Sequence, residues 1–253
     1  MSATNRGGER AELDAFFTPE PLAEAIVEVL KTDGYLCEGD RVLEPSIGLG
    51  AFVKFIGSEY TDEVHGCDRV LRKPLLELWE KSRYVGDLCE GDFLQYQEQP
   101  FCCIVGNPPL SEAQAHIEHG IELLEPHGSL AFLLRLNFLA GIERGAFYEA
   151  YPPDAVYVLD KRPSFAKVVH CTEKKCGWRV ILPPMEKKPA KCPKCGAKTD
   201  CTGSDACEYG VFVWRKHPMR GHEPAIRWIK WAERYKRWAK KLRVEQKKMM
   251  EET

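Results

Sequence analysis

A single amide side chain stands on a rigid turn near the middle of the sequence. The apolar run 101–106 is followed by Asn107, Pro108, Pro109 and Leu110. Neither proline can donate a backbone hydrogen bond to a sheet, so a buried strand must end here and the chain must turn. The prolines fix the position of the Asn107 amide in advance, which is the condition under which polar groups catalyse reactions electrostatically.

Four cysteines occur in two pairs at the spacing of metal ligands. Cys171 and Cys176 form a C-x4-C pair, and Cys192 and Cys195 form a C-x2-C pair after 15 intervening residues. This pattern is close to that of a zinc ribbon, and four thiolates would close the tetrahedron around a structural Zn2+. The alternative is a loop of free thiols, which the paired spacing disfavours. Three further side chains could substitute for a ligand: Cys201, Cys207 and His170.

A glycine-rich turn with an acidic neighbour follows the first apolar strand. In the segment LEPSIGLGAF, Gly48 and Gly50 allow the backbone to approach a ligand, and Glu44 adds a negative charge. The turn lacks the third glycine of a dinucleotide fingerprint and the Lys of a phosphate-binding loop. A carboxylate here would repel a pyrophosphate, so the loop suits a cofactor that carries an ammonium group and no phosphate.

Two more carboxylates follow at the ends of the next two strands. Asp68 comes about 20 residues after the loop, where a carboxylate can accept hydrogen bonds from both hydroxyls of a ribose. Asp92 and Phe93 end a third strand and could offer an acceptor for an adenine amino group and a ring against its face. Each carboxylate alone is explained well as a solvated turn residue, but their repetition at successive strand ends indicates a nucleoside site.

Strands and helices alternate through the first 160 residues. Continuous apolar strands separated by helices predict a Rossmann-like, doubly wound α/β fold, in which a mostly parallel sheet is covered on both faces. Ligands of such sheets bind at the carboxyl ends of the strands, where the amide and the carboxylates would meet. The sequence predicts strands at 40–45, 63–68, 101–106, 128–136 and 155–160, and helices at 19–31, 51–56, 71–81, 112–124 and 142–150.

The strand pattern stops after residue 165 and resumes in EYGVFVWRK, which begins at Glu208. We therefore divide the chain into a body (1–165 and 208–223), a small zinc-ribbon-like insertion (166–207) and a basic C-terminal helix (224–253). The predicted helix begins at Pro224 and carries an apolar face, with Lys and Arg on much of the remaining surface. That face consists of Trp228, Trp231, Ala232, Tyr235, Trp238, Ala239 and Leu242.

The charge is distributed unevenly along the chain. Residues 1–160 contain 12 Lys and Arg against 28 Asp and Glu, whereas residues 161–253 contain 24 against 10. Either the basic part binds a polyanion such as nucleic acid, or the two parts dock on each other. The sequence contains no apolar run of the length that spans a membrane and begins without a secretory signal, so we expect a cytoplasmic protein without a membrane partner.

Taken together, the motifs resemble those of the class I S-adenosylmethionine-dependent methyltransferases that act on amino groups, the adenine-N6 and cytosine-N4 DNA methyltransferases. FFTPE resembles the cofactor-capping motif, LEPSIGLGAF the glycine loop, GCD the ribose-binding acid, and GDF the adenine-binding motif. GNPPL resembles the catalytic Asn-Pro-Pro-aromatic motif, and RPSF the motif whose ring packs against the target base. The resemblance runs from about Phe16 to Phe165 and resumes at Tyr209, and in its general character it is that of a small phage or orphan enzyme.

The resemblance implies how the motif residues act. Catalysis is assigned to Asn107, Pro108, Pro109 and Leu110, with the Asn107 side-chain oxygen and the Pro108 carbonyl accepting the two N–H groups of a nucleobase amino group. Leu110 replaces the aromatic residue that usually stacks on the extruded base, and Phe165 could supply that ring. S-adenosylmethionine would be held by Phe17, Thr18, Pro19, Glu44, Pro45, Ser46, Gly48, Gly50, Asp68, Asp92, Phe93 and Asn107.

The favoured function is therefore methylation of adenine N6 in DNA, with the insertion replacing the large target-recognition domain of the family. Three alternatives stay open. The first is an RNA adenine methyltransferase. The second is a protein glutamine methyltransferase, although such enzymes normally keep a Tyr where this chain has Leu110. The third is a non-catalytic, zinc-dependent nucleic-acid-binding module, with which Leu110 is most compatible.

Overall fold

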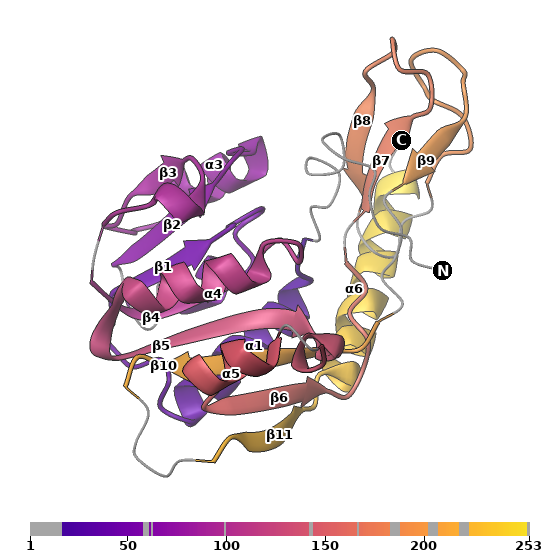
Figure 1. Ribbon diagram of the computed structural model, residues 1–253. Helices are drawn as coiled ribbons and strands as arrows, with labels where there is room; N and C mark the ends of the chain where they lie inside the picture. Colours follow the sequence, from indigo (N-terminus) through magenta and orange to yellow (C-terminus); the bar gives the residue numbers. More distant parts are fainter. Residues whose placement is uncertain are drawn as a thin grey trace.

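A mostly parallel sheet of eight strands forms the centre of the structure, a computed structural model (Figure 1). The structure describes residues 17–57, 61, 63–98, 100–141, 144–165, 167–182, 188–201, 207–217 and 223–251. The strands of the sheet are β1 (Val42–Pro45), β2 (Val64–Asp68), β3 (Leu88–Glu90), β4 (Phe101–Gly106), β5 (Leu124–Arg135), β6 (Ala155–Leu159), β10 (Tyr209–Arg215) and β11 (Ala225–Ile229). Their order is β11-β6-β10-β5-β4-β1-β2-β3, and only β10 runs antiparallel to its neighbours.

Helices cover both faces of this sheet, as the doubly wound fold requires. The helices are α1 (Glu20–Thr32), α2 (Val53–Ile56), α3 (Lys73–Lys81), α4 (Ala113–Glu122), α5 (Arg144–Ala150) and α6 (Ala232–Glu251), with short 3-10 helices η1 (Phe93–Gln95) and η2 (Leu136–Leu139). One hydrophobic core unites the first three helices and α6, and a second core lies beneath α4 and α5. The predicted α/β fold is confirmed.

The apolar runs explain why the central strands are parallel and buried on both faces. Every residue of β1 is buried, and the last four residues of β4 are buried as well. A strand that presents apolar side chains to both faces must have helices on both sides, and βα crossovers provide them. The antiparallel strand β10 continues the core, since Phe212 pairs with Phe132 on β5 and with Val156 on β6.

The cysteine-rich segment forms a separate three-stranded antiparallel sheet. Its strands are β7 (Lys167–Cys171), β8 (Arg179–Leu182) and β9 (Thr199–Cys201), in the order β8-β7-β9. Figure 1 shows this sheet projecting beyond the main sheet, near the end of α6. We call residues 167–182 and 188–201 the cysteine module; they lie within the insertion that the sequence predicts.

The prediction that a helix begins at Pro224 is wrong. Ala225–Ile229 forms β11, which pairs in parallel with β6 and becomes the edge of the sheet, and α6 begins only at Ala232. Trp228 consequently stands on the edge strand, 63% exposed, whereas Trp231 is completely buried. The three-residue spacing of these two tryptophans imitates a helical face, although the chain changes from strand to helix between them.

Membrane insertion through a helix finds no support in the described part of the chain, since none of its helices combines the length and apolarity needed to cross a bilayer.

The two tryptophans give a matched test of this boundary. Trp231 packs beside Tyr235, and its ring nitrogen donates to the carbonyl of Lys161 at 2.8 Å. We expect Trp231→Ala to lower the free energy of unfolding by about 3–5 kcal/mol, because it removes a buried ring and leaves a cavity. Trp228→Ala should change it by less than about 0.5 kcal/mol. Denaturant titration of both variants measures this, and equal losses would contradict the assigned strand.

Candidate functional site

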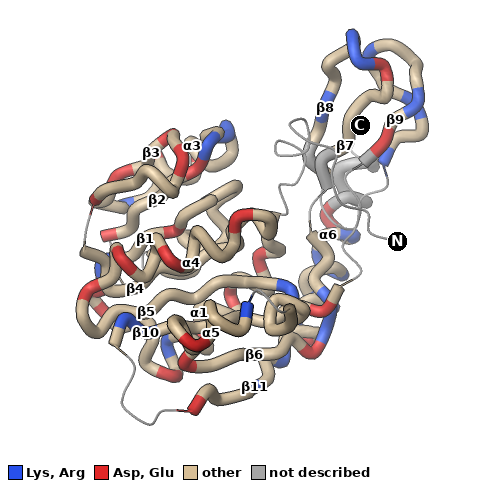
Figure 2. The backbone as a smooth tube through the Cα atoms, viewed as in Figure 1, with Lys and Arg blue, Asp and Glu red and all other residues tan. Residues whose placement is uncertain are grey.

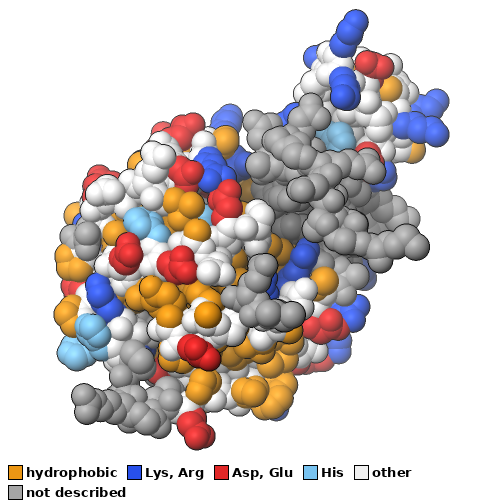
Figure 3. Space-filling model, in the orientation of Figure 1, with side chains coloured by type: hydrophobic (Ala, Val, Ile, Leu, Met, Phe, Trp, Pro, Cys, Tyr) orange, Lys and Arg blue, Asp and Glu red, His pale blue; other side chains and the backbone are white. Residues whose placement is uncertain are grey.

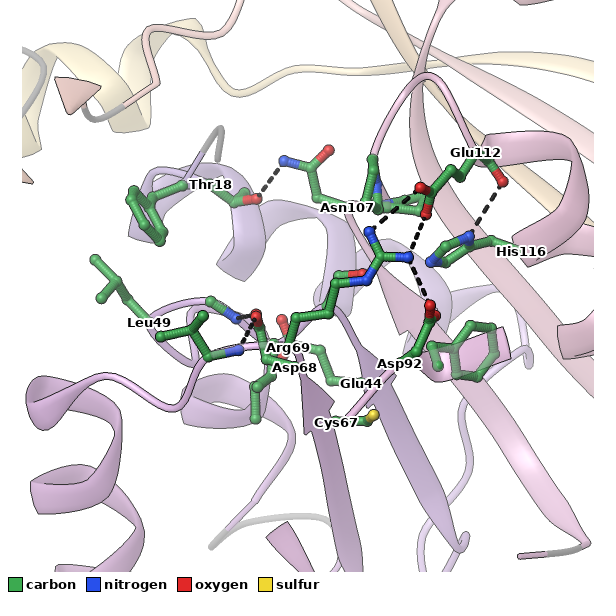
Figure 4. A pocket seen from close by; sticks show the side chains of 18 of the residues that line it. Thr18, Glu44, Leu49, Cys67, Asp68, Arg69, Asp92, Asn107, Glu112 and His116 are labelled. Carbon is green, nitrogen blue, oxygen red and sulfur yellow. Dashed lines mark hydrogen bonds and ion pairs between the residues drawn. The ribbon is translucent and has the colours of Figure 1, made fainter. Parts of the chain in front are cut away.

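One cavity collects the ends of four parallel strands. The order of the sheet reverses between β1 and β4, and ligand sites of open α/β sheets lie outside the carboxyl ends of the strands at such a switch point. Figure 4 shows the side chains that converge there. The cavity is lined by Phe17, Thr18, Glu44, Ser46, Ile47, Gly48, Leu49, Ala51, Cys67, Asp68, Arg69, Val70, Arg72, Gly91, Asp92, Phe93, Asn107, Pro108, Pro109, Ser111, Glu112 and His116.

Nine of the twelve residues predicted to hold the cofactor line this cavity. The other three are neighbours in sequence of lining residues: Pro19 precedes α1, Pro45 ends β1, and Gly50 closes the glycine turn through its N–H to the carbonyl of Ile47. Phe16, the first residue of the FFTPE motif, lies outside the described residues.

Asp68 holds the glycine loop against the end of β2. Its carboxylate accepts hydrogen bonds from the backbone N–H of Gly48 at 2.8 Å and of Val70 at 3.1 Å. Arg72 forms an ion pair with the same carboxylate at 3.7 Å. Within the loop that Asp68 holds, Ser46 adopts a left-handed backbone conformation with a φ of 61°. Such a conformation costs energy in a non-glycine residue and persists where the surroundings impose it.

Glu44 is a buried carboxyl group beneath the loop. It is 2% exposed, and its side chain accepts a hydrogen bond from the backbone N–H of Val53 at 3.0 Å. Burial raises the pKa of Glu44 well above its usual value, and the nearby charge of Asp68 adds to the increase, although backbone hydrogen bonds oppose it. The expected acid beside the glycine turn is therefore present, but it is held in surroundings that penalise its charge.

Asn107 follows β4, and its side chain is oriented by a hydrogen bond to Thr18. Its side-chain nitrogen donates to the hydroxyl of Thr18 at 3.2 Å, and Figure 4 shows the amide oxygen turned away from that hydroxyl. The neighbouring Phe17 is buried, and the guanidinium of Arg72 lies over its ring at 5.1 Å. The two segments, 89 residues apart in sequence, thus form one wall of the cavity.

An ionic bridge that the sequence does not predict spans part of this cavity. Arg69 donates to Asp92 at 2.7 Å and contacts both oxygens of Glu112, at 2.9 and 3.2 Å. These contacts raise the pKa of Arg69. Burial raises the pKa of Asp92, but the hydrogen bonds from Arg69 and Leu94 outweigh it, so that the pKa is lowered overall. A bridge between residues of different elements leaves no sequence pattern by which it could be found.

Leu110 lies on the other side of the Asn-Pro-Pro turn from most of the cofactor residues. It lines a second cavity together with Phe138, Arg144 and four small or polar neighbours, Ser111, Gln114, Ala140 and Gly141. The guanidinium of Arg144 lies over the Phe138 ring at 4.1 Å, and Phe138 is 5% exposed. An aromatic side chain therefore stands near Leu110, and it comes from η2 rather than from the position that the sequence indicates.

Phe165 does not reach either cavity, contrary to the expectation that it packs against a substrate. It is 5% exposed, belongs to the core beneath α1, and packs edge-on against Tyr209 at 5.2 Å. The segment that follows β6 places this ring in the core, so the ring is not exposed to a substrate at either cavity.

The four predicted metal ligands are brought together in the cysteine module. Their sulfur atoms lie within 4.8 Å of one another, with 3.4 Å between Cys171 and Cys195 and 3.7 Å between Cys176 and Cys192. Three of the four side chains are buried. Among the spare ligands, Cys207 packs against the main core, His170 lies outside the cluster, and the side chain of Cys201 lies outside the described residues.

The comparisons with known proteins identify the fold. No protein-family model and no curated protein matches the sequence. A solved structure from Listeria monocytogenes, a candidate class I S-adenosylmethionine-dependent methyltransferase, superposes with a TM-score of 0.59 at 12% identity, over 84% of this chain and 65% of that one. This chain thus spans less than two thirds of its length. The fold is that of the class I methyltransferases.

Two further structures show weaker likeness. A candidate RNA methyltransferase from Pyrococcus horikoshii gives a TM-score of 0.48 at 14% identity, over 85% of this chain and 92% of that one. The 23S rRNA methyltransferase ErmE gives 0.47 at 15% identity, over 80% and 70%.

The buried carboxyl group gives a pH-dependent stability. Because the pKa of Glu44 is higher in the folded than in the unfolded protein, its favourable contribution is complete below the unfolded value and is lost as the pH rises through the folded value. Glu44→Gln keeps an acceptor for Val53 without the charge, so we expect it to raise the free energy of unfolding at pH 8, on the order of 1 kcal/mol, but not at pH 4.

Thermal unfolding across pH 4–8 measures the difference. Glu20→Gln is the control, since Glu20 is an exposed carboxylate paired with Lys54 and should show no such gain at pH 8. A Glu44→Gln protein that is no more stable than the native protein at pH 8 would contradict the assigned burial of charge.

Proposed function

We propose that this protein transfers a methyl group from S-adenosylmethionine to the exocyclic amino group of a nucleobase, with adenine N6 in DNA as the favoured target. The observation that carries the proposal is that Asn107 and Pro108 face the same cavity as Glu44, Asp68 and Asp92. A cofactor held by the three carboxyl groups would therefore lie beside the amide of the Asn-Pro-Pro turn.

The cavity suits a nucleoside cofactor with a cationic end. Asp68 stands at the end of β2, where one of its oxygens accepts from Gly48 of the loop and the other from Val70, and a ribose could share them. Asp92 and Phe93 offer an acceptor and a ring at the end of β3. Carboxyl oxygens beside the loop can accept hydrogen bonds from the ammonium of a methionine moiety, which S-adenosylmethionine carries together with the sulfonium methyl group that it supplies when bound.

The Asn-Pro-Pro turn would activate the nucleophile by hydrogen bonding. The lone pair of an exocyclic amino group is delocalised into the ring, so the nitrogen is a poor nucleophile. If the side-chain oxygen of Asn107 and the carbonyl of Pro108 accept its two N–H groups, the nitrogen becomes pyramidal and exposes its lone pair. Thr18 fixes which end of the amide faces the target, because it accepts from the amide nitrogen. Groups set in advance lower the reorganisation cost of the reaction.

The target base would enter from the side of Leu110. The second cavity adjoins the first at Ser111, which lines both. Leu110 and Phe138 give it apolar walls, and Arg144 adds a cation that could meet a phosphate or a base edge. A cavity with two apolar walls and a polar rim, joined to the cavity of Asn107 at Ser111, suits a flat base extruded from a duplex or a single strand.

The cysteine module fits a structural Zn2+. Four thiolates at zinc–sulfur distances near 2.3 Å lie about 3.8 Å apart in a tetrahedron, close to the 3.4 and 3.7 Å between the paired sulfur atoms. The module's own core consists of Cys171, Cys176 and Cys192, with Trp178 and Ala197 packed against them. So small a core cannot fold the module alone, and a metal would supply the missing stability.

The module also carries the charge expected for contact with nucleic acid. Its described residues contain eight Lys and Arg against two Asp and Glu, and Figure 2 shows basic residues on its outer end, away from the sheet. β6, which leads into the module, is parallel to β11 and antiparallel to β10, so its carboxyl end lies at the same edge of the sheet as the cavity. Phosphates held by the module would therefore lie on the cavity's side of the protein.

Asn107→Ala tests the chemical proposal. We expect it to lower methyl transfer about a hundred- to a thousandfold, because one of two preorganised acceptors is lost, while the affinity for S-adenosylhomocysteine changes little. Tritium transfer from labelled S-adenosylmethionine to duplex DNA, RNA and protein measures turnover and separates the substrate classes. Asp68→Ala is the matched variant, because we expect it to weaken binding of the cofactor itself. Turnover retained in Asn107→Ala would exclude this mechanism.

Cys192→Ser tests the metal and the partner together. We expect the native protein to contain one Zn2+ per chain, and the variant to lose the ion and the fold of the module but keep cofactor binding, because the main sheet has its own cores. At low salt its affinity for DNA should be as weak as the affinity that the native protein shows at high salt. Elemental analysis and fluorescence anisotropy measure these, with Cys37→Ser, an exposed thiol on the body, as control.

Native protein without zinc would exclude the metal site. Unchanged DNA and RNA binding in Cys192→Ser would exclude the module as the recognition element.

A further inference from the structure

His116 is a buried histidine in the wall of the cofactor cavity. It lies on α4, is 2% exposed and lines the cavity together with Asp92 and Phe93. Its ring packs against Phe93, with 5.2 Å between centroids and an angle of 39° between the planes. The packing holds the imidazole in a fixed orientation at the end of β3.

The hydrogen bonding of His116 determines which ring nitrogen carries the proton. Nδ1 lies 3.1 Å from the backbone carbonyl of Glu112. A carbonyl oxygen can only accept, so Nδ1 must donate, and the neutral ring then keeps its lone pair on Nε2. Within the described residues Nε2 makes no hydrogen bond, and Figure 4 shows it turned toward the guanidinium of Arg69 and the carboxylate of Asp92.

The surroundings of His116 favour the neutral ring. Burial lowers the pKa of His116, and the charge of Arg69 lowers it further, whereas the backbone bond and charge of Glu112 and the charge of Asp92 raise it less strongly. His116 therefore presents an acceptor to the cavity rather than a donor.

The polar groups around this corner are almost all acceptors. Asp92 and Glu112 are carboxylates, and Nε2 of His116 carries a lone pair. The donor among the neighbouring side chains is Arg69, which bonds to both carboxylates. An amino group, with two N–H donors in one plane, matches two such acceptors. A carbonyl oxygen in the same place would meet lone pairs and gain no hydrogen bond.

We propose that His116 determines the base specificity of the cofactor site: its Nε2 accepts one N–H of the adenine amino group, beside Asp92, which accepts the other. The inference rests on the proposed use of S-adenosylmethionine. His116 acts as a positioning and specificity residue and takes no part in the transfer.

The test compares S-adenosylhomocysteine with S-inosylhomocysteine, in which a carbonyl oxygen replaces the adenine amino group. Isothermal calorimetry gives the affinity of the native protein and its variants for each. We expect the native protein to prefer the adenosyl compound by tenfold or more, about the worth of one or two hydrogen bonds at a buried site. His116→Phe keeps a ring against Phe93 but removes the acceptor, so the preference should fall about tenfold.

Two further variants separate the acceptor from the packing. His119→Phe is the control, because His119 also packs against Phe93, at 5.1 Å, but its Nε2 contacts the carbonyl of Tyr96, and it does not line the cavity. Its preference should equal that of the native protein. His116→Gln, whose amide oxygen can take the place of Nε2, should restore part of the preference lost in His116→Phe.

The outcomes distinguish the two levels of the inference. Tight binding of S-adenosylhomocysteine with an unchanged preference in His116→Phe would overturn the role of His116 alone. Failure of the folded native protein to bind either compound would overturn the proposed cofactor and the role of His116 with it. Equal losses of preference in the His116→Phe and His119→Phe proteins would assign the effect to packing on Phe93 and reject the hydrogen bond.

Discussion

The parallel pairing of β1 with both β2 and β4 is the constraint on which the site depends. Val42 lies opposite Val64 on one side and Cys103 on the other, so the three strands run in the same direction and end at one edge. The residues that follow each strand are thereby brought together although they are separated in sequence. Because the helices leave to opposite faces at this point, a hollow remains between them that side chains of the strand ends line.

Much of the fold and part of the site could be predicted, because they depend on local pattern. The apolar strands, the glycine turn and the Asn-Pro-Pro turn are each defined by a few consecutive residues, and the topology then places Asp68, Asp92 and Asn107 at one cavity. The spacing of the cysteines likewise predicted a cluster that the structure assembles.

The features that could not be predicted depend on contacts between elements, or on a spacing of apolar residues that suggests a helix where the chain forms a strand. Arg69 and Glu112 are 43 residues apart, and nothing in either segment indicates that they bond. Phe165 ends a sequence, RPSF, that resembles a motif, yet its side chain is buried in the core. The tryptophans at 228 and 231 satisfy a helical spacing, although the β-branched and aromatic run AIRWI pairs with an available sheet edge. There, pairing in the sheet outweighs the periodicity of the side chains.

The division of charge between body and module limits how a polyanion could approach. Most of the acidic residues belong to the first 160 residues, and their field would repel nucleic acid from most of the body. Figure 3 shows Lys and Arg gathered on the projecting module, while both signs are mixed over the visible face of the body. Under the proposed function, attraction at the module and at the basic residues of α6, with repulsion from the acidic residues of the first 160, would together orient a bound strand. Since the module is attached at the sheet edge that carries the cavity, nucleic acid bound to the module as proposed would lie on the same side of the protein as Leu110 and Asn107.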